Sequence, residues 1–316
     1  MPCYSPIYHP LILTSNISVM KIQKAILICS LATAGLLFAS CKKDTPKQEQ
    51  KTTVQEQKAT QLAPGEVRVD FIQAGNLETI LKDTDREKLT KLVVGSGMLN
   101  QADLTYITKS LKIQEIDLTN ATLSLKDDDK GFNYNSSLKK IIAPANLEKT
   151  QMDWFSDTQA TEFIFPGEKL RIFGGATHNV NLKSIVLPNS VEELGEQAFK
   201  DSNFESITLS SKLKAIPAEA FKSCRRLTQI TIPASVTEVG ISAFANCGKL
   251  KTITFLCPAP TFTTNADGEN VQNAFTDYDL NIEPTITVPK GTKDAYFKAL
   301  GIGSRGQLAK RFVEAE

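Results

Sequence analysis

A short pattern of apolar and polar positions recurs along most of the chain. It reads apolar-x-x-apolar-x-apolar, and its eight copies begin at Leu89, Ile113, Leu138, Ala160, Leu182, Phe204, Leu227 and Leu250. Successive copies start 22 to 25 residues apart. Because apolar positions alternate with polar or β-branched ones at the end of each copy, each copy predicts a strand with one buried face. Repetition at so regular a spacing predicts a solenoid of stacked units.

An Ala-Phe pair follows the predicted strand in the C-terminal copies. The Phe lies 12 residues after the last apolar position of the strand, and Phe155 keeps the same offset from Ala143. A single unit cannot bury its own apolar side, whereas stacked copies cover one another. We therefore expect a structural ladder in the interior, made of Phe155, Phe199, Phe221 and Phe244.

His178 has two interpretations. Leu170 and Phe173 lag by one residue against the neighbouring copies, and with that lag His178 falls where the other copies place Phe. We interpret His178 as a substitution in the ladder. The alternative is a catalytic base.

Two cysteines occupy equivalent places in adjacent copies. Cys224 and Cys247 each lie three residues after a ladder Phe. Equivalent side chains on stacked units point in parallel, which favours a buried column of small side chains over a disulfide between them. With Cys257 they make an odd number of cysteines beyond residue 41, which argues against a full disulfide framework.

The C-terminal copies have the form L-x-x-I-x-I-P-x-S-V-x-x-I-G-x-x-A-F-x-x-C. This form resembles the repeat of the BspA-like leucine-rich-repeat family, closely across residues 182–255 and more loosely across 89–181. The resemblance implies an α/β repeat solenoid, a right-handed superhelix with a parallel sheet, short helical turns and capped ends. That family consists largely of secreted or surface-anchored bacterial and protist proteins implicated in adhesion and in host or glycan contact. It has no general catalytic centre.

The N-terminal residues resemble an export signal. Residues 21–41, KIQKAILICSLATAGLLFASC, contain two lysines, a short apolar run and small residues before a cysteine, as a secretory signal does. Residues 38–41, FASC, resemble the lipobox of bacterial lipoproteins, which implies acylation of Cys41 and a lipid anchor in a membrane. We assign residues 1–40 to the signal peptide. Met20, directly before the lysines, is a more natural start than Met1, and on that reading residues 1–19 are a misassigned start.

The remaining chain divides by composition. Residues 41–64 are polar after the cysteine and predict a disordered tether. Residues 65–88 predict an N-terminal cap of a strand and a short helix, and residues 89–257 the solenoid. Residues 258–316 predict a polar insertion, a last strand and a helical cap from about residue 292 to 300, with Gly301 suited to end the helix.

One face of the predicted sheet is a candidate binding face, because the third and fifth positions of each copy point outward. Its candidate residues are Glu115, Asp117, Lys140, Ile142, Glu162, Ile164, Ser184, Val186, Ser206, Thr208, Gln229 and Thr231. The third positions alternate in charge sign over four strands and then become uncharged. This alternation favours register support between strands, and a ligand would be selected by shape, hydrogen bonding and the apolar strip Ile142-Ile164-Val186.

Composition restricts the chemistry further. A net charge of +1 gives no general attraction to nucleic acid. His178 is the one histidine after the signal, which excludes multi-histidine metal sites and restricts any Ser-His-Asp triad to that residue. Residues 127–131, DDDKG, lack the alternate spacing and closing Glu of a calcium loop, so a solvated insertion is favoured. Trp154 and Phe155 offer an alternative aromatic contact for a sugar ring. We expect no metal and no cofactor.

These observations predict a monomeric, non-catalytic binding module on a lipid anchor in the outer membrane. The leading function is adhesion or capture of a protein or glycan at the cell surface. The alternative is a periplasmic scaffold or envelope-assembly factor, and a hydrolase comes third.

Overall fold

The computed structural model describes residues 57–151, 154–176, 178–179, 181–263, 274–275 and 284–316. These residues belong to one compact unit that begins at Val54. The expected signal peptide, the lipidated Cys41 and the tether up to residue 56 lie outside the described residues. No helix in the described part is both long and apolar enough to cross a membrane.

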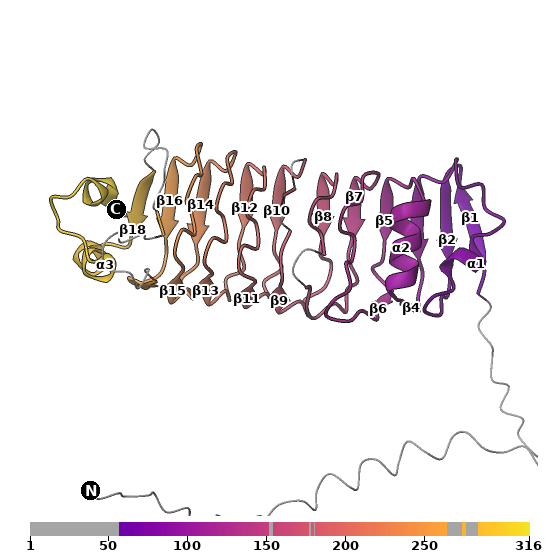
Figure 1. Ribbon diagram of the computed structural model, residues 1–316. Coiled ribbons are helices and arrows are strands. Elements are labelled where there is room, and N and C mark those ends of the chain that lie inside the picture. The colour runs from indigo at the N-terminus through magenta and orange to yellow at the C-terminus, as the bar shows by residue number, and fades with distance from the viewer. Residues whose placement is uncertain (1–56, 152–153, 177, 180, 264–273, 276–283) are drawn as a thin grey trace, which may run out of the picture. The chain divides into compact units, whose positions relative to one another are not determined.

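Parallel strands, one from each repeat, run along this unit side by side (Figure 1). We call this row of strands the long sheet, although its hydrogen-bonded pairing is broken between β8 and β10 and between β12 and β14. Its strands, in spatial order after the first hairpin, are β2 (Glu66–Val69), β3 (Lys91–Val94), β5 (Glu115–Asp117), β7 (Lys140–Ile142), β8 (Glu162–Ile164), β10 (Ser184–Val186), β12 (Ser206–Thr208), β14 (Gln229–Ile232), β16 (Thr252–Phe255) and β18 (Thr285–Val288). Paired strands match repeat position to repeat position, as in Gln229 opposite Thr252. The predicted repeat solenoid is confirmed.

A second, narrower set of parallel strands lies on the other side of most units (Figure 1). It consists of β4 (Met98–Leu99), β6 (Thr122–Leu123), β9 (Ile172–Phe173), β11 (Glu193–Leu194), β13 (Ala215–Ile216), β15 (Glu238–Val239) and β17 (Thr261–Phe262). These two-residue strands carry the second apolar positions of each repeat, such as Leu194 and Val239, into the core. A repeat is therefore two strands joined by turns, with its apolar side chains between them.

The N-terminal end is closed by more structure than the sequence indicated. Strand β1 (Ala59–Ala63) pairs antiparallel with β2, so the expectation of a disordered tether up to residue 64 is wrong over residues 59–63. The sequence of β1, ATQLA, shows no alternation of apolar and polar residues, and the strand is held by backbone pairing along the edge of β2. Helix α1 (Leu77–Ile80) follows β2, as expected for the cap.

Helix α2 (Gln101–Ser110) replaces the short turns of the other repeats and was not predicted. Asn100 begins it as N-cap, and Asp103 completes a capping box by accepting from the Asn100 N–H. The buried Asp103 carboxylate also accepts from the N–H groups of Gly75, at 2.6 Å, and Leu77, at 2.9 Å. One carboxylate therefore holds α2, α1 and the preceding turn together.

The C-terminal cap contains the expected helix and one further strand. Helix α3 (Lys293–Leu300) ends at Gly301, whose φ of 66° is left-handed, and β18 is the predicted last strand. After a 3₁₀ turn, η1 (Leu308–Arg311), strand β19 (Phe312–Glu314) pairs parallel with β18. The Phe312 ring lies 5.5 Å from that of Phe297, so β19 closes the core beneath the helix.

Stacked phenylalanines fill the interior. The rings of Phe199, Phe221 and Phe244 follow one another at 5.4 and 5.6 Å with nearly parallel planes. The stack continues past residue 257, the expected solenoid boundary, because Phe275 lies 6.0 Å from Phe244. Toward the N-terminus the stack includes Phe155, as expected, and then Phe132 at 6.1 Å.

His178 does not belong to this stack. Between Phe155 and Phe199 the ring is that of Phe173, at 6.5 and 5.3 Å, and it enters from strand β9. The placement of His178 in the ladder is therefore wrong. Its side chain is 53% exposed, and its Nε2 lies 3.6 Å from the Asp201 carboxylate.

Backbone hydrogen bonds show which residue stands at the ladder position of this repeat. The Phe199 N–H donates to the Ala220 carbonyl of the next unit, and the Ala176 N–H donates in the same way to Ala198. Ala176 thus stands where other repeats have Phe, and His178 comes two residues later. That later position is left-handed in successive repeats, with φ of 51° to 60° at Asp157, His178, Asp201, Ser223 and Asn246.

A column of buried hydrogen-bond donors runs beside the rings. Cys224 donates to the Phe199 carbonyl at 3.1 Å, and Cys247 donates to the Phe221 carbonyl at 3.0 Å. Ser202 makes the equivalent bond to Ala176, at 2.9 Å. No disulfide joins the cysteines. The cysteines form part of a column of small buried side chains, as expected. Each side chain in the column also donates a hydrogen bond to a backbone carbonyl of the preceding repeat.

Candidate binding face

The outer surface of the long sheet presents two columns of side chains. Strand pairing aligns the third positions with one another and the fifth positions with one another, as in Ser184 opposite Ser206 and Val186 opposite Thr208. Residues between these columns, such as Ile185 and Ile230, are buried. All twelve candidate residues therefore lie on one surface, divided into a charged and an uncharged part.

The charged part lies at the N-terminal end and is paired internally. Lys91 is 3.1 Å from Glu66 and 3.4 Å from Glu115 on the two flanking strands. Hydrogen bonding to Glu66 is the main cause that raises the Lys91 pKa. Lys140 lies 3.6 Å from Glu162. Because the opposite charges cancel across neighbouring strands, this part supports strand register more than it attracts a distant charged partner.

The uncharged part extends from β10 to β18. Its outward strand residues are Ser184, Val186, Ser206, Thr208, Gln229, Thr231, Thr252, Thr254, Thr285 and Thr287. Four threonines occupy the fifth position in succession, and neighbouring strands in a sheet are about 4.8 Å apart. This surface offers regularly spaced hydroxyl groups that both donate and accept.

An apolar strip occupies the fifth positions of β7, β8 and β10, beside the charged pair of Lys140 and Glu162 and next to the uncharged part. Ile142 and Ile164 are half-buried, and Val186 is 62% exposed. Isolated exposed apolar residues are common on protein surfaces. Here the three lie on adjacent strands, which makes the strip a contact surface for a partner that also bonds to the hydroxyl groups.

The other sequence candidates lie elsewhere. Trp154 and Phe155 are buried, so neither ring offers an open face to a sugar, and that interpretation is wrong. Asp127 lies near Lys149 and Gln151, at 3.6 and 2.6 Å, as part of an exposed insertion. The described residues contain no group of three or more His, Cys, Asp or Glu side chains placed to hold a metal ion.

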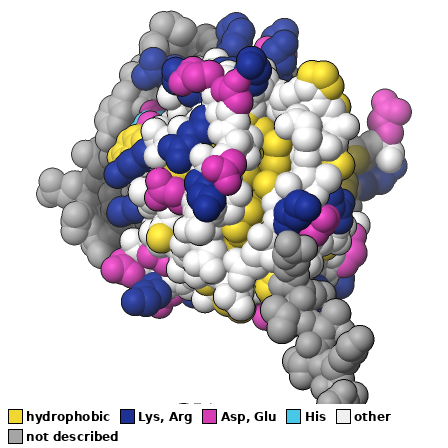
Figure 2. Space-filling model, turned by 90° about the vertical axis from the view of Figure 1, so that its right-hand side faces the viewer, with side chains coloured by type: hydrophobic (Ala, Val, Ile, Leu, Met, Phe, Trp, Pro, Cys, Tyr) yellow, Lys and Arg dark blue, Asp and Glu magenta, His cyan; other side chains and the backbone are white. Residues whose placement is uncertain are grey.

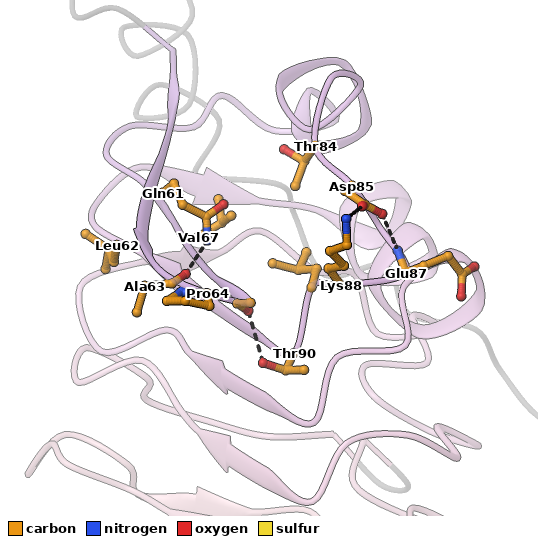
Figure 3. Close-up of a pocket in the computed structure, with 12 residues that line it drawn as sticks. Gln61, Leu62, Ala63, Pro64, Val67, Thr84, Asp85, Glu87, Lys88 and Thr90 are labelled. Carbon is orange, nitrogen blue, oxygen red and sulfur yellow. Dashed lines mark hydrogen bonds and ion pairs between the residues drawn. The ribbon is translucent and has the colours of Figure 1, made fainter.

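A pocket of about 830 Å³ lies at the N-terminal end between the β1–β2 hairpin and residues 84–90 (Figure 3). Leu62, Pro64 and Val67 contribute its apolar wall, and Figure 2, which faces this end, shows hydrophobic side chains between charged ones. The polar groups are paired: Lys88 lies 2.8 Å from Asp85, whose pKa it lowers by hydrogen bonding. The pocket offers apolar surface and no evident chemistry.

Comparison with known proteins identifies the repeat. The family model for the BspA type leucine rich repeat region matches in 6 copies, over residues 87–177 and 171–266. The chain belongs to this family. BspA-type membership, expected from residues 182–255, therefore extends over the looser N-terminal repeats. The family groups bacterial surface repeat proteins, which favours a non-catalytic binding role. A search of curated proteins found no match.

The chain is also similar to several solved structures. A leucine-rich repeat protein from Bacteroides ovatus has 16% identity, with 72% of this chain and 70% of that chain covered and a TM-score of 0.31. A leucine rich cell surface protein from Faecalibacterium prausnitzii has 15% identity, with coverage of 73% and 86% and a TM-score of 0.30. A leucine-rich repeat protein from Eubacterium ventriosum has 16% identity, with coverage of 62% and 70% and a TM-score of 0.29.

Proposed function

We propose that this BspA-type protein is a lipid-anchored cell-surface module that captures a protein or glycan partner on the uncharged part of its long sheet. The observation that carries the proposal is the outer surface of strands β10 to β18, where exposed hydroxyl groups lie beside the apolar strip. A partner would bind there through short-range hydrogen bonds and apolar contact. No catalytic residue is assigned to this face: His178, which lies 3.6 Å from the Asp201 carboxylate, is on a turn and not on these strands.

Anchoring through Cys41 is tested by Cys41→Ala in cells that make the full chain. The proposal expects the unaltered protein to partition with membranes and detergent, and the variant to lose this partitioning, because acyl chains supply the membrane affinity. Equal partitioning of both proteins would contradict the lipid anchor.

Surface display is tested by protease treatment of intact cells. Digestion of the repeats without loss of a periplasmic marker supports capture at the surface. Protection of the repeats until the outer membrane is opened would contradict it and favour the alternative, a periplasmic scaffold or envelope-assembly factor. Hydrolysis of any substrate in a survey with the purified chain, lost on His178→Ala, would support the third function, a hydrolase.

A further inference from the structure

The outward side chains of strands β14, β16 and β18 form a regular grid. These strands lie side by side (Figure 1) and pair in register, third position to third and fifth to fifth. Neighbouring strands are about 4.8 Å apart, and outward residues of one strand are about 6.6 Å apart. One column of the grid is Gln229, Thr252 and Thr285, and the other is Thr231, Thr254 and Thr287. Two columns of polar groups therefore run along the solenoid axis.

The hydroxyl groups of this grid are not used inside the molecule. Among the described residues, no hydrogen bond joins the hydroxyl groups of its five threonines to another residue. Threonines immediately before a long-sheet strand behave differently. Thr161 donates to the Lys139 carbonyl of the preceding repeat at 3.2 Å. Thr228 donates to the Glu205 carbonyl in the same way, at 3.3 Å. The grid hydroxyls can therefore both donate to and accept from a bound partner.

The spacing of the grid restricts what can bind along it. A partner that lies along the columns and bonds to every strand must repeat at the strand spacing. An extended peptide repeats every 3.4 Å or so, and would fall out of step with the strands after one or two residues. In an extended β-linked polysaccharide, one pyranose ring occupies about one strand spacing. Each ring can therefore meet one strand.

The chemistry of a sugar ring also fits these side chains. Its hydroxyl groups donate and accept, as those of threonine do. Its C–H groups can pack against the threonine methyl groups, which lie beside the hydroxyls. The six grid residues carry no charge, and burying an unpaired charge against them would be costly. The grid therefore favours a neutral polymer.

We propose that the grid binds a linear, neutral, β-linked polysaccharide that lies along the solenoid axis with one ring on each strand. The inference rests on the function proposed above, because it names the ligand class of the same face. Thr208 on β12 extends the hydroxyl column toward the N-terminus. At the other end the column stops at Val313 on β19, which stands opposite Thr287 and is 43% exposed.

The test compares oligomers of different length by calorimetric titration of the soluble chain from Lys42 onward. The probes are cellobiose and cellotetraose, the β-linked mannobiose and mannotetraose, and the α-linked maltotetraose. At least one β-linked tetramer should bind about tenfold or more tightly than its dimer, because the longer chain bonds to more strands. Maltotetraose should bind at least about tenfold more weakly than that tetramer, because its α-linkages curve the chain out of step with the strands.

Matched variants locate the binding on the grid. Thr254→Val keeps the shape of the central side chain and removes its hydroxyl, so it should weaken binding of the tetramer about fivefold. Thr261→Val makes the same change at an exposed threonine of β17, outside the long sheet, and should leave binding unchanged. Far-ultraviolet circular dichroism checks that both variants are folded.

Three results would overturn the inference: no β-linked oligomer binds, dimer and tetramer bind equally, or Thr261→Val weakens binding as much as Thr254→Val. The function proposed above fails separately. If a protein partner binds and is lost on Thr208→Glu and Thr231→Glu while no oligomer binds, the polysaccharide is excluded and capture on this face stands.

Discussion

At the scale of single residues, equivalent positions in successive repeats do the same structural work. A ladder ring fills the interior, a left-handed residue turns the chain two positions later, and a buried donor follows to satisfy a carbonyl of the preceding unit. The repeated inward positions therefore determine the stability of the fold, whereas the outward strand positions are free to vary. Phe199 and Cys224 offer direct tests of this division.

Phe199→Ala should destabilise the protein by about 3–5 kcal/mol, because the fully buried ring contacts both neighbouring rings and its loss leaves a cavity. Urea unfolding followed by circular dichroism measures the effect. The matched control is Val186→Ala on the exposed face, which should change stability by no more than about 0.5 kcal/mol. Equal effects of the two substitutions would contradict the ladder.

The Cys224 thiol should resist labelling in the folded protein. Burial is the main cause that raises its pKa, so little thiolate forms at pH 8. Ellman's reagent at that pH should react with Cys224 only after denaturant is added. The raised folded-state pKa also means that its contribution to stability is complete below the ordinary thiol pKa of about 8.5 and is lost as the pH rises above it. Rapid labelling without denaturant would show that the column is open.

At the scale of elements, the strands and helices that could be predicted were those whose sequence has a strong periodic pattern of apolar residues. The long-sheet strands were predictable because each repeat alternates inward apolar and outward polar residues. Strand β1 was not predictable, because its sequence lacks this alternation and the strand is held by backbone pairing with β2. Helix α2 lacks a strong apolar stripe, and its one readable signal was Asn100 followed three residues later by Asp103.

The prediction from sequence was wrong at the repeat that contains His178. Alignment by the apolar residues placed His178 in the ladder, whereas alignment by the buried donors would have matched Asn179 with Ser202 and put Ala176 at the Phe position. The compensating ring of Phe173 comes from a different strand. Such an exchange is tertiary packing, which repeat spacing does not specify.

Asp103→Ala tests the junction of α1 and α2. It should lower stability by about 2 kcal/mol or more, because three backbone N–H groups lose a shared acceptor in a buried place. Asn100→Ala, which removes only the N-cap side chain, should cost about 1 kcal/mol. Thermal unfolding ranks the two variants, with the exposed Lys109→Ala as control. A smaller effect for Asp103→Ala than for Asn100→Ala would contradict the junction.

At the scale of the whole molecule, the solenoid separates its tasks along its length. The N-terminal strands pair their charges internally, the C-terminal strands present hydroxyl groups, and the caps close the core at both ends. This arrangement gives an extended surface whose outward residues can change without disturbing the interior. The central claim is that the uncharged part of this surface captures a partner.

The most direct test is a glycan and matrix-protein binding screen with the soluble chain from Lys42 onward. We predict at least one specific partner, whose binding is lost when the face carries Thr208→Glu and Thr231→Glu, because contact with an uncharged partner would remove water from two carboxylates without pairing them. The matched control is Thr237→Glu, an exposed threonine outside the long sheet, which should bind normally. Binding that persists unchanged in the face variant, or no binding to any partner in the screen, would contradict the claim.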